Sequence, residues 1–447
     1  MKVLLVDPPY EIEEIGGKNR SFKYALNRIP SLGLAYLASV GEEKGHEIKI
    51  YDCTLSGGAG DFDYYLDKFK PELIGFTATT PLFSKAVALA RYARRQLPSV
   101  SIICGGPHST ACPEDTLNSE AFDFAVIGEG ESTFSDLLDW FSDGKKNSPE
   151  NIKGVAFKKE DKIIKAPSRP MITDLDSIPK PARHLLAPLN RYSPTPASYR
   201  RLPLGVIITS RGCPANCTFC DRAVFGEEYR KRSVSNIMEE IEELISVYGA
   251  KEIRFFDDTF TLDHSRIRTL CREIKKFKPP VSWTCLTRVD IVNPEVLKMM
   301  RDAGCWQVLY GLESGDNDIL TKLGKNTTVE QNRQAVLWAK KAGLRIRADF
   351  LVGSPWETKD SFSKTVEFAG SLPLDFAHFN KFVPYPGTAI YEQLLREGYK
   401  FSFNEGAYIN NPESFVYVPE GFSGEEFREK IIEAHKSFYL RPAYIMK

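Results

Sequence analysis

Short apolar runs alternate with longer amphipathic stretches along the first 145 residues. An apolar run bounded by turn residues is typical of a buried strand, and apolar positions recurring every three to four residues predict a helix. The strand-like runs lie at 2–6, 46–52, 73–78, 99–106 and 122–130. The helical patterns lie at 32–45, in a stretch ending at 72, at 84–96 and at 133–144. This alternation predicts a doubly wound, Rossmann-like α/β domain with a parallel sheet over residues 1–145.

The polar or glycine-containing loops of this domain all follow predicted strands. They read DPPY at 7–10, TATTP at 77–81, GGPHST at 105–110 and GEGES at 128–132. Because the carboxyl ends of parallel strands meet at one edge of a sheet, we expect these loops to line one ligand crevice. A dinucleotide site is disfavoured, since the first strand leads into DPPY and not into G-x-G-x-x-G.

Residues 146–203 differ in character from the sequence before them. The segment GVAFKKEDKIIKAP at 154–167 alternates like a β-hairpin, and prolines are frequent from 177 to 203. We interpret this region as a structured connector containing a hairpin.

Strand and helix patterns alternate again from residue 204 onward. The strand-like runs lie at 205–210, 252–256, 281–286, 306–312, 345–353 and 376–383, and the helical patterns at 235–249, 265–277, 294–304, 329–343 and 360–372. Six such units over 204–395 predict a complete or partial TIM-type (β/α) barrel, whose reactive groups are expected at the carboxyl ends of its strands. The remaining segment, 396–447, is aromatic and ends in a predicted helix at 427–439.

Composition and charge exclude several classes of function. Lys plus Arg is 59 and Asp plus Glu is 59, so there is no basic excess for nucleic acid, and nucleic acid is not an expected partner. No run approaches the roughly 18 to 20 apolar residues that span a bilayer. The start MKVLLVDPPY is expected to be a buried strand and not a signal peptide. The nine cysteines are sparse for 447 residues, which favours a reducing cytoplasm.

Three of the cysteines form a distinct motif. Cys213, Cys217 and Cys220 lie in SRGCPANCTFCDRA, directly after the first predicted barrel strand, whereas the other six are isolated and expected to be small buried side chains. A structural zinc site would need a fourth nearby ligand, and the nearest histidine downstream is His264. Three thiolates spaced C-x3-C-x2-C instead favour a [4Fe–4S] cluster with one iron left open, although a zinc knuckle completed by a distant residue is the alternative.

This motif resembles the cysteine loop of the radical SAM enzymes, in which the open iron binds S-adenosylmethionine and the cluster generates a 5′-deoxyadenosyl radical. Phe219 stands at the aromatic position of the loop. The resemblance implies that the three cysteines are the catalytic metal ligands. Polar residues at other strand ends would surround the same mouth and bind S-adenosylmethionine, although paired acids after a strand also serve as helix caps. These residues are Asp257, Asp258, Arg288, Glu313 and Ser314.

The amino-terminal segments IPSLGLAYLAS, GFTATT, GGPHST and FAVIGEGES resemble the cobalamin-binding domain fused to one large radical SAM subgroup. With the closing FYLRPAYIMK, the resemblance covers nearly the whole chain. It implies cobalamin as a third cofactor, held by residues of the crevice loops and the first helix: Leu32, Gly33, Thr77, Thr80, Gly105, Gly106, His108, Gly128, Glu129 and Glu131. The D-x-H-x-x-G motif of broader cobalamin binders is absent, so we expect no histidine on cobalt, and expect His108 to contact the cofactor periphery or cap a helix.

The resemblance implies a cobalamin-dependent radical SAM enzyme that methylates an unactivated carbon. Two alternatives stay open: a radical oxidative cyclase similar to the anaerobic magnesium-protoporphyrin ester cyclases, and a non-catalytic corrinoid or iron–sulfur binding protein. A methylthiotransferase is disfavoured, since neither an amino-terminal cysteine set nor a basic carboxyl end is visible.

The expected partners are a small-molecule substrate and an electron donor such as a flavodoxin or ferredoxin. Aromatic residues near the carboxyl end would cover an apolar or flat substrate, or serve only to pack the domain. These are Tyr399, Phe401, Phe403, Tyr408, Phe415 and Tyr417.

Overall fold

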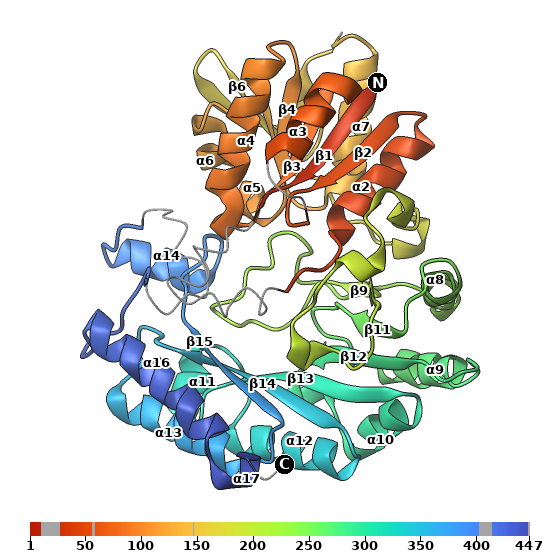
Figure 1. The fold of residues 1–447 in the computed structure, drawn as a ribbon. Helices are drawn as coiled ribbons and strands as arrows, with labels where there is room; N and C mark the ends of the chain where they lie inside the picture. The colour runs from red at the N-terminus through yellow and green to blue at the C-terminus, as the bar shows by residue number, and fades with distance from the viewer. Residues whose placement is uncertain (10–26, 56–58, 146, 402–413, 446–447) are drawn as a thin grey trace. The chain divides into compact units, whose positions relative to one another are not determined.

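The structure is a computed structural model that describes residues 1–9, 27–55, 59–145, 147–401 and 414–445. The chain forms two compact units (Figure 1). Unit 1 contains Met1–Ser193 together with Asp221–Arg230, and unit 2 contains Pro194–Cys220 and most of the chain after Lys231. Each unit is built around its own parallel sheet.

Unit 1 contains five parallel strands in the order β2-β1-β3-β4-β5. This order is that of a flavodoxin-like doubly wound sheet, and its crevice falls between β1 and β3, where the winding direction reverses. The strands are β1 (Lys2–Asp7), β2 (Glu47–Asp52), β3 (Leu73–Thr77), β4 (Ser101–Gly105) and β5 (Phe124–Val126). The predicted doubly wound α/β fold is therefore confirmed, and its polar loops follow the carboxyl ends of β1, β3, β4 and β5.

Helices cover both faces of this sheet because successive strand residues point to opposite sides. Val3 and Leu5 of β1 pack against α2 (Leu32–Glu43) and α7 (Gly130–Ser142). On the other face, Leu4 and Val6 share a core with α3, the π-helical turn η2 and α4. The remaining helices of this unit are α3 (Ala59–Tyr64), η2 (Tyr65–Phe69), α4 (Phe83–Gln96), α5 (Pro107–Ala111) and α6 (Pro113–Asn118).

The hairpin expected within the connector does not stand apart from the sheet. Its strands, β6 (Val155–Lys159) and β7 (Lys162–Lys165), continue the sheet beyond β5 in antiparallel orientation. Ala156 and Phe157 pair with β5, and both are buried although they point to opposite faces of the sheet. The first half of β6 is therefore covered on both faces by the cores of unit 1.

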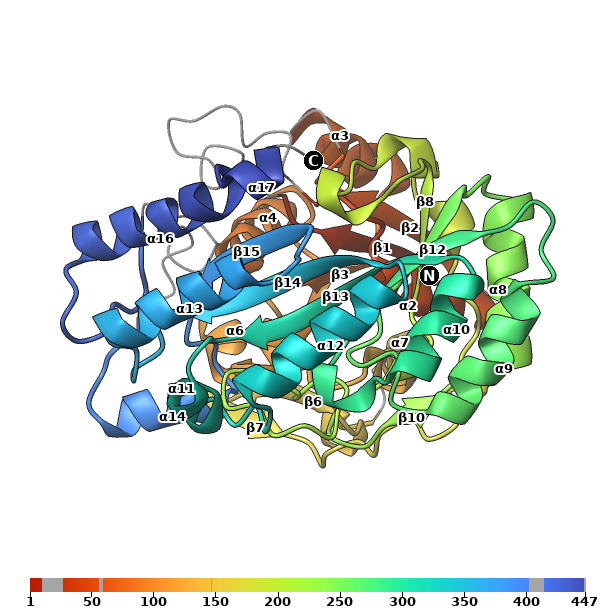
Figure 2. The same ribbon diagram turned by 90° about the horizontal axis from the view of Figure 1, so that it is seen from below.

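Unit 2 contains six parallel strands in the order β15-β14-β13-β12-β11-β8. They are β8 (Leu204–Ile207), β11 (Glu252–Phe255), β12 (Ser282–Thr287), β13 (Cys305–Glu313), β14 (Arg345–Val352) and β15 (Phe376–Lys381). Helices α8 (Val234–Ser246), α9 (His264–Ile274), α10 (Pro294–Asp302), α12 (Val329–Lys341) and α13 (Lys359–Ser371) follow the strands in turn, and Figure 2 shows them along the outer face of the sheet. Among the described residues no ladder joins β8 to β15, so the barrel is partial.

The open edge of β15 is covered by α16 (Gly424–Tyr439), the predicted carboxyl-terminal helix. The Tyr439 hydroxyl donates to the Ala377 carbonyl oxygen at 2.9 Å and accepts from the Ala377 amide at 3.3 Å. His435 Nε2 accepts from the Phe379 amide at 3.4 Å. These side chains satisfy edge groups that another strand would otherwise pair.

Further short strands and α-helices are β9 (Ser210–Arg211), β10 (Arg230–Lys231), α11 (Asn317–Lys322), α14 (Ala389–Arg396) and α17 (Pro442–Ile445). None of the described helices combines the length and the apolar character that crossing a bilayer requires.

Candidate active site

The cysteine loop of unit 2 is held in place by backbone hydrogen bonds. The Thr218 amide donates to the Leu323 carbonyl at 2.9 Å, and the Thr218 carbonyl accepts from the Ile390 amide at 3.0 Å. The Cys220 amide donates to the Cys217 carbonyl at 3.2 Å, forming a tight turn between two of the predicted ligands. Thr218 therefore anchors the loop between the end of α11 and the start of α14.

All three cysteines of the loop reach the surface to some extent. Cys213 and Cys217 are half-buried, and Cys220 is exposed. Cys213 Sγ lies 3.4 Å from the Thr259 hydroxyl. Among the described residues, no three His, Cys, Asp or Glu side chains are close enough to hold a single metal ion. A four-iron cluster requires something different, one thiolate on each of three irons, and this donor set fits that requirement.

Arg288 connects the cysteine loop to its polar surroundings. Its Nη1 donates to Cys217 Sγ at 3.4 Å, and its Nε and Nη2 bind the two carboxylate oxygens of Asp290 at 2.9 and 2.8 Å. Burial alone would lower the pKa of Arg288, but the Asp290 carboxylate and the Cys217 sulfur raise the pKa above its usual value. The Asp290 carboxylate thereby fixes the guanidinium beside Cys217, one of the predicted cluster ligands.

The two predicted acids after β11 lie in different environments. Asp257 is 2% exposed, and its oxygens accept from the Thr209 amide and hydroxyl and from the Ser210 hydroxyl, with Arg266 as its ion-pair partner. Asp258 reaches the surface. Desolvation by neighbouring atoms and then the Asp257 charge raise the pKa of Asp258, while the Gly212 amide opposes the shift. Asp257 thus ties β8 to α9, which leaves Asp258 as the accessible carboxylate.

Glu313 ends β13 in a left-handed backbone conformation with φ of 61°. The strand register shifts between Gly311 and Glu313, and the Glu313 carboxylate is ion-paired with Lys325 at 2.8 Å. A residue other than glycine with positive φ is uncommon and often marks a functional position. Ser314 is buried, and its hydroxyl lies 3.1 Å from the Thr365 hydroxyl, so its contacts are within the protein.

The aromatic residues of the carboxyl-terminal segment pack on unit 2 itself. Phe401 stacks on Tyr391 with ring centroids 4.9 Å apart, Tyr399 contacts Tyr417, and Phe415 contacts Phe427. The cysteine-loop Phe219 packs against a cluster formed by Phe382, Ile390, Leu394 and Tyr417. Phe403 and Tyr408 lie outside the described residues.

The predicted crevice residues of unit 1 gather at the carboxyl edge of its sheet. Thr77 ends β3 and Gly105 ends β4. Gly106 has φ of 93°, and a Cβ atom there would lie 2.9 Å from the Thr77 hydroxyl, so only glycine fits. Gly128 also has positive φ, with open space at its Cβ position, and its amide donates to the Thr110 hydroxyl at 3.1 Å. Thr110 therefore links the two glycine loops.

His108 is fully buried inside unit 1. Its ring stacks on Phe83 with centroids 3.9 Å apart, and Nδ1 lies 3.2 Å from the Thr80 hydroxyl. Burial lowers the pKa of His108 to about 4, so the imidazole is neutral at physiological pH. Thr80, which was also predicted to bind cofactor, instead uses its hydroxyl to orient this ring.

Glu129 and Arg230 form an ion pair within unit 1. Arg230 Nη1 lies 2.8 Å from Glu129 Oε2, and each side chain is 3% exposed. Glu129 also accepts from the Ile172 amide at 2.8 Å. Arg230 closes the segment that follows Cys220, so the carboxylate predicted to bind cofactor is engaged by the chain itself. Glu131, the second residue of α7, is buried as well.

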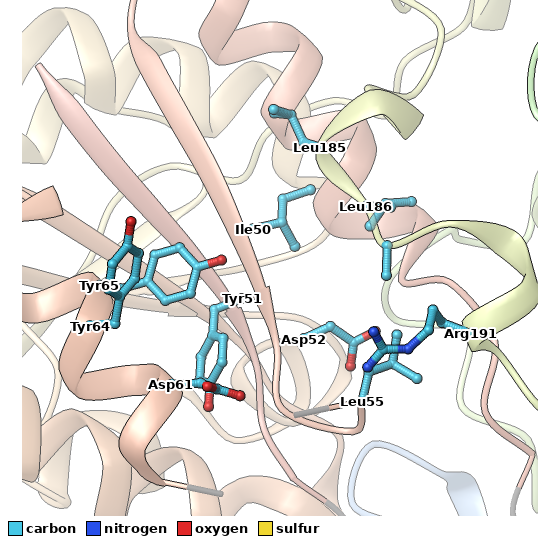
Figure 3. A pocket seen from close by; sticks show the side chains of 11 residues that line it. Ile50, Tyr51, Asp52, Leu55, Asp61, Tyr64, Tyr65, Leu185, Leu186 and Arg191 are labelled. Atoms are coloured by element: carbon cyan, nitrogen blue, oxygen red, sulfur yellow. The ribbon is translucent and has the colours of Figure 1, made fainter. Parts of the chain in front are cut away.

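The predicted residues of α2 begin that helix. Leu32 is buried, whereas Gly33 is exposed with nothing within 4 Å of its Cβ position. A cavity of about 420 Å³ lies in unit 1 at the end of β2, and none of the predicted cofactor-binding residues lines it. Figure 3 shows Asp52 and Arg191 on the side of this cavity opposite Tyr51, Tyr64 and Tyr65.

The six isolated cysteines differ from the loop cysteines in their environment. Cys112 is half-buried, and the other five are buried. Burial raises the pKa values of Cys104 and Cys271 to about 12, which keeps these thiols protonated and poor as metal ligands. Apart from Cys112, the isolated cysteines are therefore less accessible than the three cysteines of the loop.

Comparisons with known proteins agree with this arrangement. Residues 207–369 match the radical SAM superfamily, and residues 23–138 match the B12 binding domain. An uncharacterized methyltransferase of Pyrococcus horikoshii is 37% identical, over 100% of this chain and 94% of its own length. The chain belongs to the cobalamin-dependent radical SAM enzymes. Its cofactors are a [4Fe–4S] cluster, S-adenosylmethionine and cobalamin.

The chain is also similar to a more distant relative and to a solved structure. The anaerobic magnesium-protoporphyrin IX monomethyl ester cyclase of Rubrivivax gelatinosus is 26% identical, over 100% of this chain and 78% of its own length. The solved structure of the radical S-adenosylmethionine methyltransferase TsrM from Kitasatospora setae, with cobalamin and a [4Fe–4S] cluster bound, matches with a TM-score of 0.74 at 18% identity. That match covers 99% of this chain and 89% of the other, and it shows that the two proteins share a fold. Radical SAM enzymes act on small molecules and require a reductant.

Three residues near the site carry no sequence signal that identifies them. Lys325 neutralises Glu313, Asp290 orients Arg288, and Arg230 neutralises Glu129. Each is an ordinary charged residue in a loop or at a strand end, and only the folded chain brings it to its partner.

Proposed function

We propose that this radical SAM enzyme transfers a methyl group from S-adenosylmethionine to an unactivated carbon of a small molecule. The observation that carries the proposal is the 37% identity to the Pyrococcus horikoshii methyltransferase along the whole chain. When bound, the cluster and cobalamin supply the radical and methyl-carrier chemistry, respectively, and the protein positions them and excludes water. We place the enzyme in the cytoplasm, with a flavodoxin or ferredoxin as electron donor.

The residues of unit 2 would divide the work of holding the cluster and S-adenosylmethionine. Cys213, Cys217 and Cys220 would each give a thiolate, and Arg288 would stabilise the charge on Cys217. Asp258 is placed to accept a hydrogen bond from an ammonium or hydroxyl group. Glu313 could do the same while Lys325 balances its charge.

The residues of unit 1 would hold cobalamin through backbone groups and small side chains. Gly128 has open space at its Cβ position, and Thr77, Gly105 and Gly106 lie at the same carboxyl edge of the sheet, where their backbone groups and small side chains would contact the ligand. Glu129, Glu131, Thr80 and His108 would support this edge from within, since each is buried. We propose the domain limits 1–145, 146–203, 204–395 and 396–447 for the cobalamin-binding domain, connector, barrel and carboxyl-terminal segment.

The cluster assignment is tested with cysteine variants of anaerobically reconstituted protein. Cys217→Ala should lose the iron–sulfur absorbance and S-adenosylmethionine cleavage, whereas Cys271→Ala, a buried cysteine of the same unit, should keep both. Essential Cys271 with dispensable Cys217 is the result that would refute the assignment.

The reaction type is tested with S-adenosylmethionine labelled on its methyl group. Turnover of a metabolite extract from a deletion strain should give S-adenosylhomocysteine and 5′-deoxyadenosine in comparable amounts, with label in one product. The likeness to the Rubrivivax gelatinosus cyclase favours one alternative, radical oxidation or cyclisation. That chemistry predicts 5′-deoxyadenosine without matching S-adenosylhomocysteine and no label in the product, and this outcome would refute methyl transfer.

A further inference from the structure

The inner face of the sheet in unit 2 carries charged side chains where a barrel of this type usually holds apolar layers. In β11, Ile253 and Phe255 are each 1% exposed, and Ile253 lies with Leu244 of α8 around Gly205, on the side of the sheet that the helices cover. Arg254 lies between them and so points to the opposite, inner face. In β14 the same alternation places Arg347 and Asp349 on the inner face between fully buried apolar residues.

Arg254 has no hydrogen bond or ion pair with any described residue. Its guanidinium carbon lies 4.6 Å from the centroid of the Phe256 ring. Its Nη1 atom is buried without an acceptor. Thr284, the register partner of Arg254 on β12, is 4% exposed, and its hydroxyl is also buried without a partner. Two adjacent strands therefore present unsatisfied polar groups at the same level.

The Asp349 carboxylate compensates the charge of Arg254 only in part, because Asp349 also faces Arg347. Arg347 Nη2 donates to His378 Nδ1 at 3.0 Å, and Arg347 Nε lies 3.7 Å from Asp349 Oδ1. Burial, and then the Arg347 charge, lower the pKa of His378 to about 3, so this ring is neutral. Asp349 is thus shared with Arg347, and the cluster has two guanidinium groups for one carboxylate.

Burial and the Arg347 charge lower the pKa of Arg254 to about 10, against the Asp349 charge, which raises it, so the group still carries its charge at neutral pH. A charge without an ion-pair partner in a partly desolvated site is unfavourable, and buried charges in proteins are normally paired. A guanidinium with a free edge and an adjacent hydroxyl match the two oxygens of a carboxylate or phosphate.

We propose that Arg254 and Thr284 bind a carboxylate or phosphate group of the substrate, so that the substrate of this enzyme is an anion. The inference rests on the proposed function, because it names the substrate class of the same site. It replaces the expectation of a purely apolar or flat molecule drawn from the carboxyl-terminal aromatic residues, which pack on their own unit.

The position of Arg254 suits this role. Arg254 pairs in register with Val206 of β8, the strand that leads into the cysteine loop. On β14, Asp349 lies near enough to Glu313 for their charges to interact. If the anionic group of the substrate binds Arg254, the rest of the substrate would extend toward the carboxyl ends of the strands, where the cluster ligands and Glu313 lie.

Calorimetric titration of the anaerobic holoenzyme with succinate or inorganic phosphate tests the site, with neutral succinamide as the control ligand. Wild-type protein should bind both anions and not succinamide, and Arg254→Met should weaken binding by roughly 10-fold or more, the loss expected for a charge-assisted contact. Arg254→Lys should retain part of the affinity. Arg268→Met, an exposed arginine of α9, should bind like wild type.

Thermal unfolding without added anion separates a ligand site from a structural role. Arg254→Met should unfold at the same temperature as wild type or higher, because an unpaired charge is removed. A lower unfolding temperature, or equal anion binding by wild type and Arg254→Met, would overturn the proposal.

Two further measurements show whether the bound anion belongs to the substrate or to S-adenosylmethionine, and separate this question from the test of methyl transfer. If saturating S-adenosylmethionine abolishes succinate binding, the site serves the carboxylate of that cofactor and the substrate assignment is wrong. Binding that persists supports a substrate anion. Failure of methyl-label transfer would remove the proposed function while leaving these binding results intact, so the two failures are distinguishable.

Discussion

Replacing Asp7 with asparagine should stabilise unit 1 at alkaline pH. Asp7 ends β1 and pairs in register with Asp52 at the end of β2. Asp52 is held by the Thr54 amide and hydroxyl at 2.9 and 2.6 Å, so Asp7 must carry the proton if only one carboxylate is charged. Burial first, and the Asp52 charge second, raise the pKa of Asp7 from 3.8 to about 7, against a hydrogen bond from Ser31 that lowers it.

The sign and size of the effect follow from this shift. The unfolded chain loses the Asp7 proton near pH 3.8, whereas the folded protein keeps it up to about pH 7. The stabilisation from this proton is complete below pH 3.8 and is lost as pH rises through 7. Between pH 5 and pH 8 the wild-type free energy of unfolding should fall by at most about 3 kcal/mol from this group, and Asp7→Asn should not show this fall.

Hydrogen exchange of β1 peptides, compared between wild type and Asp7→Asn at each pH, measures the difference because intrinsic exchange rates then cancel. The protection ratio of variant to wild type should grow up to roughly 100-fold from pH 5 to pH 8. Glu47→Gln, an exposed acid on β2, controls for loss of a negative charge. A ratio that is the same at both pH values would refute a raised pKa at Asp7.

Other predictions concern each unit separately. Glu129→Gln should cost about 3–5 kcal/mol in urea unfolding of unit 1, because it leaves buried Arg230 uncompensated; a cost below about 1 kcal/mol would contradict a tight pair. Tyr439→Phe should speed amide exchange at Ala377, with a loss of about 1–2 kcal/mol, and unchanged exchange would argue against edge capping. His108→Ala should leave the paramagnetic spectrum of bound Co(II) cobalamin unchanged, because the His108 ring is buried against Phe83 and does not coordinate cobalt. Splitting that disappears in this variant would establish histidine ligation.

The pattern of apolar residues predicted the strands and helices of both units, because each element buries apolar side chains at regular positions. Strands such as VLLV at 3–6 are buried on both faces of a doubly wound sheet, so their sequence is continuously apolar. The cysteine spacing was equally informative, since three ligands of one cluster must lie close together in the chain. The hairpin was visible as two strands, but the edge that it joins is set by contacts with β5 that lie outside its own pattern.

The polar contacts of the site depend on residues far apart in the chain. Asp257 and Asp258 are adjacent and identical in type, yet Asp257 is buried beside Arg266 while Asp258 is exposed, because their side chains leave the loop after β11 in different directions. Glu129 meets Arg230 across 101 positions. Arg254 lies in an apolar strand, where a single charge gives no sign of its unsatisfied donor.

The helix that covers β15 has a consequence for how this fold can diversify. In a closed barrel, strand number, tilt and stagger fix the internal diameter together. Here the side chains of Tyr439 and His435 bond the backbone of β15 and end the sheet. The position of α16 against this one strand edge therefore sets the width of the sheet. Altering how α16 docks could change the room inside the sheet while β8 and the cysteine loop keep their register. Removing α16 would instead expose a strand edge and favour self-association.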